Sequence, residues 1–149
     1  MNKIKIFLAA PISAFDDENE YRKYRNIILS LILSLRQDEF DVYSEVEHVT
    51  EKSNYDSPAQ SVKDDFEKIK KSDVFLLFHP KKAQTSALIE LGYAYAMQKK
   101  VIIISRKELL PYLALGILSV CSAAIIIELC NEFGSEFYEE IKNALTRLF

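Results

Sequence analysis

Residues 72–105 read SDVFLLFHPKKAQTSALIELGYAYAMQKKVIIIS, and this stretch decides the predicted fold. The apolar runs at 74–78 and 101–104 are short and uninterrupted, which is typical of strands buried on both faces of a parallel sheet. Between them, Thr85 or Ser86 can cap a helix whose apolar residues recur at helical spacing, namely Ala87, Leu91, Ala94 and Tyr95. Strand, helix and strand in this order predict one unit of a doubly wound α/β sheet.

Glu90 falls in the first turns of that helix, just beyond the carboxyl end of the preceding strand. In open parallel sheets, the crevice outside the carboxyl ends of the strands holds the ligand, so Glu90 is our leading catalytic candidate. The alternative is that an acid near a helix N-terminus stabilises the helix dipole by about 0.3–1 kcal/mol and has no other role. Gly92 allows a close approach to the sheet, and the hydroxyls and free N–H groups at Thr85 and Ser86 suit an anion; both features favour the functional interpretation.

The rest of the chain continues the alternation of strands and helices. Further strands are predicted near 3–9, 40–44 and 123–128, and further helices near 17–36, 58–71 and 132–148. We expect one α/β domain over 1–149, a flavodoxin-like (Rossmann-like) fold whose five-stranded parallel sheet has the order 2-1-3-4-5 and carries helices on both faces.

In that topology the loops after strands 1 and 3 meet at one edge of the sheet. They bring together the candidate substrate-binding residues Ala9, Pro11, Ile12, Ser13, His79, Gln84, Thr85 and Ser86. For His79 the alternative is an ordinary loop residue, since a single histidine before a proline needs no ligand. The polar segment 45–57 is the longest predicted loop and the expected mobile lid.

Asp65 is the second acid of interest. It lies three residues after Val62 and four before Ile69, on the helix stripe that is predicted to face the sheet with Phe66. A half-buried carboxylate there would have a raised pKa suited to proton transfer. The alternative is a helix-edge acid bonded to a backbone or basic group, because structural ion pairs perturb pKa values as well.

Composition excludes several classes of protein. The net charge is only −3 and the basic residues are scattered among acids, so no nucleic-acid polymer is expected as a partner. Cys121 and Cys130 lie in apolar surroundings, far in sequence from His48 and His79, which predicts core thiols in a reducing compartment and no metal site. The N-terminal run fits a first strand better than a secretion signal, and no apolar stretch is long enough for a membrane helix. We expect a cytoplasmic protein that uses no cofactor.

Three segments together resemble the nucleoside 2-deoxyribosyltransferase family, whose relatives include 2′-deoxynucleoside 5′-monophosphate N-glycosidases. They are IFLAAPIS at 6–13, DFEKIKKSD at 65–73 and SALIELGYA at 86–94, and the resemblance covers roughly residues 3 to 105. It implies that Glu90 is a nucleophile that attacks the anomeric carbon, and that Asp65 bonds the base and helps to protonate it as it leaves. It also implies that Glu45 meets the sugar or the base. Retaining glycosidases use a carboxylate and an acid in the same way.

The chain also departs from that family's pattern. Gln84 stands where the transferases have an Asp, Ser86 stands where many relatives have Gly, and Phe7 aligns loosely with a sugar-contacting aromatic residue but lacks its hydroxyl. Loss of the Asp with retention of Thr85 and Ser86 favours a nucleotide over a plain nucleoside. The resemblance further implies a homo-oligomer, in which residues 109–118 form either a contact surface or a buried helix.

Two other functions fit the predicted layout. One is a TIR-like enzyme or sensor that cleaves or binds NAD or a nucleotide signal, since such domains share the flavodoxin-like arrangement and a Ser and Glu at the crevice. The other is a non-catalytic nucleotide-binding module in which Glu90 only bonds ribose hydroxyls. Release of nicotinamide, release of a nucleobase, or ligand-induced stabilisation without turnover would separate the three.

Overall fold

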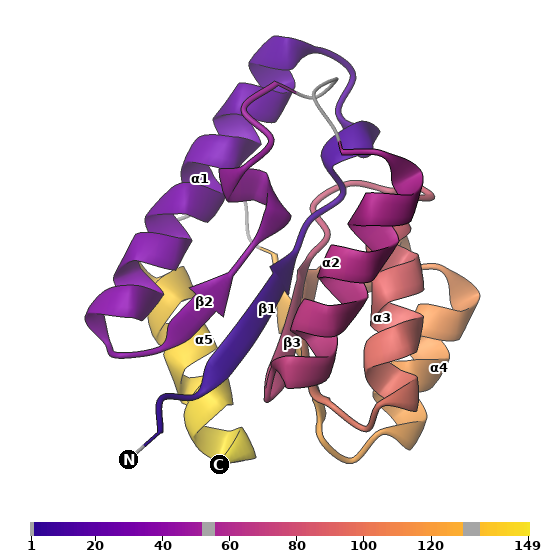
Figure 1. Cartoon of the computed structure of the whole chain (residues 1–149). Coiled ribbons are helices and arrows are strands. Elements are labelled where there is room, and N and C mark those ends of the chain that lie inside the picture. The colour runs from indigo at the N-terminus through magenta and orange to yellow at the C-terminus, as the bar shows by residue number, and fades with distance from the viewer. Residues whose placement is uncertain (1, 52–55, 130–134) are drawn as a thin grey trace.

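A computed structural model describes residues 2–51, 56–129 and 135–149 of the chain. Its five strands form one parallel sheet of order β2-β1-β3-β4-β5, which confirms the predicted fold (Figure 1). The strands are β1 (Lys5–Ala9), β2 (Asp41–Tyr43), β3 (Val74–Phe78), β4 (Lys100–Ser105) and β5 (Ala124–Glu128).

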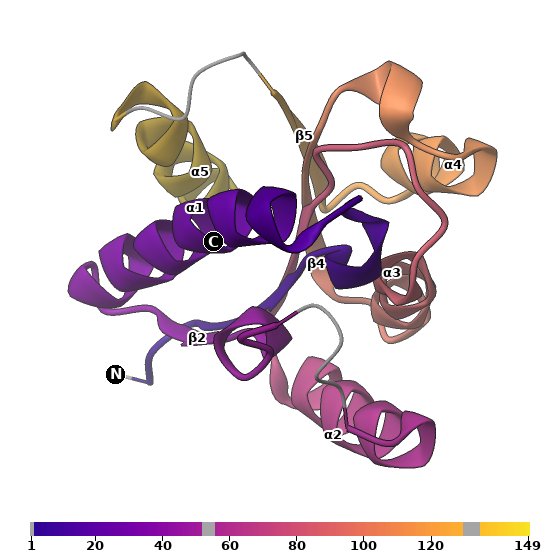
Figure 2. The same ribbon diagram turned by 90° about the horizontal axis from the view of Figure 1, so that it is seen from above.

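Helices cover both faces of the sheet. One face carries α1 (Glu18–Gln37) and α5 (Ser135–Leu148), and the other carries α2 (Pro58–Lys71), α3 (Ser86–Ala96) and α4 (Tyr112–Val120), as Figure 2 shows. Three short 3₁₀ turns, η1 (Ile12–Ala14), η2 (Glu45–Glu47) and η3 (Lys107–Leu109), follow β1, β2 and β4. The turns at Ile12–Ala14 and Glu45–Glu47 lie at the carboxyl edge of the sheet, where they shape the site described below.

The central strand explains why the core divides into two layers. All five residues of β3 are buried, and alternate side chains point to opposite faces of a strand. Val74, Leu76 and Phe78 therefore pack under α1 and α5, whereas Phe75 and Leu77 pack under α2, α3 and α4. The uninterrupted apolar run that predicted this strand is thus the consequence of helices on both sides.

Two apolar residues were predicted to face the core and do not. Val62 is 53% exposed and Tyr95 is 41% exposed, while Ile69 and Ala94 on the same helices are fully buried. Val62 lies toward the start of α2, where the helix projects past the end of the strands and borders a pocket. Tyr95 lies about 100° further round α3 than Ala94, at the edge of the buried stripe.

Several predictions concern the ends of elements and the cysteines. The last helix is described from Ser135, and residues 132–134 of its predicted range lie outside the described residues. In the predicted lid, Glu45–Glu47 forms a 3₁₀ turn, and residues 52–55 lie outside the described residues. Cys121 is partly buried, and Cys130 lies outside the described residues.

Within the described part of the chain, no helix combines the length and apolar character needed to cross a membrane.

Candidate functional site

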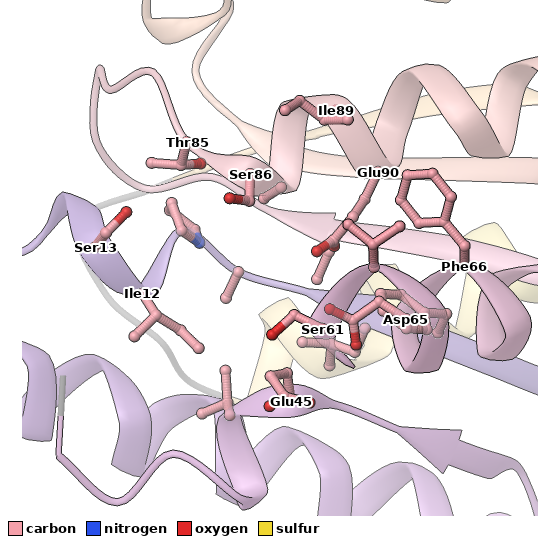
Figure 3. Close-up of a pocket in the computed structure, with 18 of the residues that line it drawn as sticks. Ile12, Ser13, Glu45, Ser61, Asp65, Phe66, Thr85, Ser86, Ile89 and Glu90 are labelled. Atoms are coloured by element: carbon pink, nitrogen blue, oxygen red, sulfur yellow. The ribbon is translucent and has the colours of Figure 1, made fainter. Parts of the chain in front are cut away.

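A pocket of about 560 Å³ opens at the carboxyl edge of the sheet. The end of β1 with η1, the turn η2, the first half of α2 and the start of α3 form its walls (Figure 3). This is the crevice in which doubly wound sheets hold their ligands, and the volume lies within the usual range for small-molecule sites. The sheet topology alone therefore accounts for the position of the pocket.

Most of the candidate site residues meet here. The pocket is lined by nine of the predicted residues, Ala9, Pro11, Ile12, Ser13, Glu45, Asp65, Thr85, Ser86 and Glu90. They come from five separate elements, and Figure 3 shows Glu45, Asp65 and Glu90 directed into the same space.

The structure places the two other candidates away from the pocket wall. The backbone N–H of His79 donates to Ile104 O at 2.8 Å, which extends the β3–β4 ladder by one residue. Because Phe78 points toward α1 and α5, the His79 side chain points to the opposite layer, where it is fully buried. Burial lowers the pKa of His79, so the imidazole is neutral and part of the core. Gln84 is exposed on the loop before α3.

Other lining residues were not predicted. Ser61 lies one turn before Asp65 on α2 and, like Val62 and Phe66, faces the pocket (Figure 3). Ile89 lines the pocket beside Glu90 although it is 67% exposed. The spacing of Ser61 to Asp65 is a signal that the sequence contains, because residues four apart share a helix face. The sequence contains no comparable signal that Val62 and Ile89 are exposed, since apolar residues at helical spacing usually pack inside the protein.

Asp65 is the most buried acid of the pocket. It is only 7% exposed, and no described group forms a hydrogen bond with its buried Oδ1. Burial raises the pKa of Asp65 to about 7, and the negative charges of Glu45, Asp64 and Asp56 contribute to the rise. A carboxyl group with such a pKa can hold a proton near neutral pH and release it to a substrate.

Glu90 reaches the pocket from α3, opposite Asp65. The pKa of Glu90 is raised to about 8, mainly by burial and then by the charges of Asp65 and Glu45. Among the described residues that line the pocket, none is Lys, Arg or His, so no cation offsets these carboxylates. Because the charge of Asp65 disfavours the ionisation of Glu90, the titrations of the two acids are coupled.

Glu45 is held at the third corner by the turn η2. The hydroxyl of Tyr43 donates to Glu45 Oε2 at 3.0 Å. Arg25 on α1 donates from Nε to Val46 O at 3.1 Å and from Nη2 to Glu47 O at 3.3 Å. The guanidinium of Arg25 thus fixes the backbone of the turn from outside the pocket.

The start of α3 provides a different kind of surface. Thr85 is the N-cap residue, but its side chain makes no capping hydrogen bond, and its buried Oγ1 has no hydrogen-bond partner among the described residues. Ser86 and Ser13 lie on the same side of the pocket (Figure 3). Hydroxyls and free N–H groups at a helix N-terminus attract anions and hydroxyl-bearing ligands. The pocket therefore joins an acidic end to an end that suits a phosphate.

The described residues around the pocket form no cluster of metal-binding side chains. Within the described ranges, no group of three or more His, Cys, Asp or Glu residues is arranged to hold a metal ion.

Three solved structures are similar to this chain. The CMP N-glycosidase BcmB of Clostridium botulinum has 27% sequence identity with a TM-score of 0.70, and the match covers 93% of this chain and 98% of that one. BlsM has 17% identity and a TM-score of 0.79, covering 97% of this chain and 90% of BlsM. A conserved protein from Enterococcus faecalis V583 has 15% identity and a TM-score of 0.63, covering 99% of this chain and 100% of that one. The last two show the fold alone.

No curated protein matches the chain. A family model does match, and its description is "Nucleoside 2-deoxyribosyltransferase like". It matches residues 3–108, which include β1, the whole of α2 and α3, and every residue that lines the pocket. The chain therefore belongs to the nucleoside 2-deoxyribosyltransferase-like family.

Proposed function

We propose that this protein cleaves or transfers the N-glycosidic bond of a nucleoside or nucleoside 5′-monophosphate, with Glu90 as nucleophile and Asp65 as acid. The observation that carries the proposal is a pair of carboxyl groups in a pocket of about 560 Å³ whose described lining residues include no Lys, Arg or His. The pKa values of these carboxyl groups are raised to about 7 and about 8. Functional sites are where such perturbed acids concentrate. Membership of the family supports the same class of substrate.

The chemistry would run in two steps. The Glu90 carboxylate attacks the anomeric carbon, the carbon–nitrogen bond breaks, and its electron pair leaves with the base, which takes the proton of Asp65. This leaves a glycosyl ester on Glu90 and a carboxylate on Asp65. Water or a second base then attacks the anomeric carbon, the bond between that carbon and the Glu90 oxygen breaks, and the nucleophile gives a proton to Asp65, which restores both groups. Hydrolysis and transfer differ only in this second nucleophile.

The protonation states required by this scheme follow from the coupled pair. Glu90 must be ionised and Asp65 must carry the proton, although the pKa of Glu90, about 8, exceeds that of Asp65, about 7. When the pair holds a single proton, that proton is therefore more often on Glu90. The reactive arrangement, with the proton on Asp65, is the less populated of the two. The positive charge that develops at the anomeric carbon as the carbon–nitrogen bond breaks stabilises the Glu90 carboxylate, so the transition state favours the reactive arrangement.

The phosphate-compatible end of the pocket favours a nucleotide. Thr85 and Ser86 lie at the start of α3, and Ser13 of η1 lies on the same side of the pocket, so a 5′-phosphate there would meet hydroxyls and N–H groups. The CMP N-glycosidase to which the chain is similar is named for a nucleoside monophosphate. A 5′-monophosphate is therefore the substrate we would test first.

We also propose that the chain forms a homo-oligomer through α3 and α4. Leu113 is 78% exposed and Val120 is 68% exposed, and their separation of seven residues puts them on one face of α4. Ile89 on the neighbouring α3 is exposed as well. Light scattering after size exclusion should give more than one chain mass, and Leu113→Glu should reduce it; a monomeric wild type would reject the proposal.

Detection of released base tests the proposed reaction. Wild type and Glu90→Gln are incubated with deoxynucleosides, deoxynucleoside and ribonucleoside monophosphates, and NAD, each with and without an acceptor base, and the products are separated by chromatography. We expect the wild type to release a nucleobase from a monophosphate, and Glu90→Gln to lose this release. Release of nicotinamide alone would favour the NAD-cleaving alternative, and binding without any release would reject catalysis.

A further inference from the structure

We infer that the stacked rings of Phe66 and Tyr93 set the separation of the two pocket acids, which makes Tyr93 a positioning residue of the site. The inference rests on the proposed function, which needs Asp65 and Glu90 on two sides of one glycosidic bond. Phe66 of α2 and Tyr93 of α3 stack with ring centroids 4.3 Å apart and planes 12° apart. Phe66 lines the pocket and Tyr93 does not, so Tyr93 would act through this contact.

The stack lies within one helical turn of each acid. Asp65 directly precedes Phe66 on α2. Glu90 lies three residues before Tyr93 on α3, and residues three apart are neighbours on a helix surface. Figure 3 shows the Phe66 ring directed from α2 toward α3 and Glu90. A shift of one ring against the other therefore reaches the two carboxyl groups through less than one turn of helix.

A second contact joins the same two helices at the ends that lie away from the pocket. Lys99, just after α3, donates from Nζ to Lys70 O and to Ser72 O at the end of α2, at 2.7 Å each. Toward their first residues both helices border the cavity, with Ser61 on α2 and Ile89 on α3 among its lining residues. The stack therefore joins the helices between this distant contact and the open pocket, at the level of the acids.

The docking of the two helices on the sheet has other contributors. Ile69 of α2 and Leu91 and Ala94 of α3 are fully buried, and they belong to the core layer between these helices and the sheet. The stacked rings of Phe66 and Tyr93 are only partly buried. A variant without the Tyr93 ring should therefore fold, and its loss should fall on the spacing of the acids.

The spacing of the acids decides whether both can act on one bond. In the proposed reaction, Glu90 must reach the anomeric carbon while Asp65 reaches the departing base. Retaining glycosidases hold their two carboxyl groups about 5–5.5 Å apart, and a displacement of about 1 Å can lower a rate by about 100-fold. Two flat rings have a preferred stacking offset, whereas an aliphatic chain against a ring has none, so the stack fixes this spacing more narrowly.

Tyr93→Leu tests this inference, and Tyr95→Leu is the matched control. Both variants remove one tyrosine ring from α3, but Tyr95 is 41% exposed and does not line the pocket. We expect Tyr93→Leu to lower kcat for base release by roughly 10-fold to 100-fold, with KM within about threefold of wild type. Tyr95→Leu should change neither constant by more than about twofold. Tyr93→Phe keeps the ring and should bring kcat back to within about twofold of wild type.

A double-mutant cycle shows whether Tyr93 acts through Phe66. Phe66→Leu breaks the same stack from the side of α2, so adding Tyr93→Leu should lower kcat by less than about twofold more. Effects that multiply would show that Tyr93 acts by another route and would overturn the inference, as would an equal loss of kcat in Tyr95→Leu. Urea denaturation establishes that each variant is folded under the assay conditions.

Crystal structures of wild type, Tyr93→Leu and Tyr93→Phe give a measurement that does not depend on turnover. The distance between the Asp65 and Glu90 carboxyl groups should change by about 1 Å in Tyr93→Leu and stay the same in Tyr93→Phe. An unchanged distance in Tyr93→Leu overturns the role of the stack, whatever the enzyme turns over. A wild type that releases no base rejects the proposed reaction, and the distance still decides whether the stack sets the spacing of the acids.

Discussion

Two groups of carboxylates in this molecule differ in what surrounds them. On the side of α1 and α5, Asp38 accepts from the Tyr138 hydroxyl and lies 3.4 Å from Lys142 Nζ. The Tyr138 hydrogen bond and the Lys142 charge lower the pKa of Asp38. In the pocket, no Lys, Arg or His is among the described lining residues, no described group forms a hydrogen bond with Asp65 Oδ1, and the pKa of Asp65 is raised.

The surroundings of the two groups of acids determine whether ionisation of the acid favours or opposes folding. A partly exposed acid with a tyrosine and a lysine beside it gains modest electrostatic energy and keeps its charge in water. A buried acid without a partner costs stability when it ionises, and a fold retains such a group where its proton has a use. Removing charge from either group of acids therefore tests whether the two groups differ in this way.

The largest effect is expected from neutralising one acid on each side. Asp65→Asn should lower the rate of base release by about 100-fold to 10,000-fold, because the leaving base loses its proton donor. Asp38→Asn should leave that rate within about twofold, since surface acids remote from a site do not touch substrate. The measurement is kcat for the substrate found in the chromatographic panel. Equal effects of the two variants would erase the distinction between the two groups.

The next effect is a bell-shaped pH profile of the wild type. Activity should rise with pH as Glu90 loses its proton and fall as Asp65 loses its own, with a maximum between about 7 and about 8. Asp65→Asn should retain only a single limb. An activity that is flat across this range, or that is highest near pH 5, would mean that the pocket acids do not control the reaction.

A smaller effect is expected on stability. The pKa of Asp65 is raised from 3.8 to about 7, and that of Glu90 from 4.5 to about 8. Within these two pH ranges, the folded state therefore binds more protons than the unfolded chain. Stability from this source is therefore present at low pH and is lost as pH rises through that window.

Neutral variants should escape this loss. Relative to wild type, Glu90→Gln should gain on the order of 1–3 kcal/mol in the free energy of unfolding between about pH 5 and about pH 9. Urea denaturation at both pH values measures it, with Asp38→Asn as the control that shows no such gain. A pH-independent difference would indicate that Glu90 is not a buried, destabilised acid.

The smallest effect is expected from the paired side. Lys142→Met removes the lysine that bridges Asp38 and Glu139, at 3.4 Å and 3.0 Å. Because exposed ion pairs contribute little, the melting temperature should change only slightly, and 1 M salt should remove even that change. Thermal unfolding in low and high salt is the measurement, and a large loss of stability would show that these acids depend on their partners more than their exposure indicates.

Much of this structure could be predicted from local sequence patterns. The apolar run of β3 and the stripe of α1 specify their elements because period and burial are linked within a few residues. The block around Glu90 and the spacing of Asp65 were enough to predict two of the pocket acids. The positions of Val62 and His79 could not be predicted from the sequence. The exposure of Val62 depends on where α2 projects past the sheet, and the direction of the His79 side chain depends on the face that it takes where the β3–β4 ladder ends.

Sequence patterns specify the α/β alternation, the parallel order of the strands and the edge at which the site forms, because crossover handedness and strand burial leave few topologies open. Which acids lack a partner depends on the tertiary structure. Asp38 accepts from Tyr138, which lies 100 residues further along the chain, and Glu45 accepts from Tyr43. Asp65 and Glu90 converge from α2 and α3 on a pocket whose described lining residues include no Lys, Arg or His. The protonation of a carboxyl group depends on burial and on charges a few ångströms away, and both are set by segments distant in the chain.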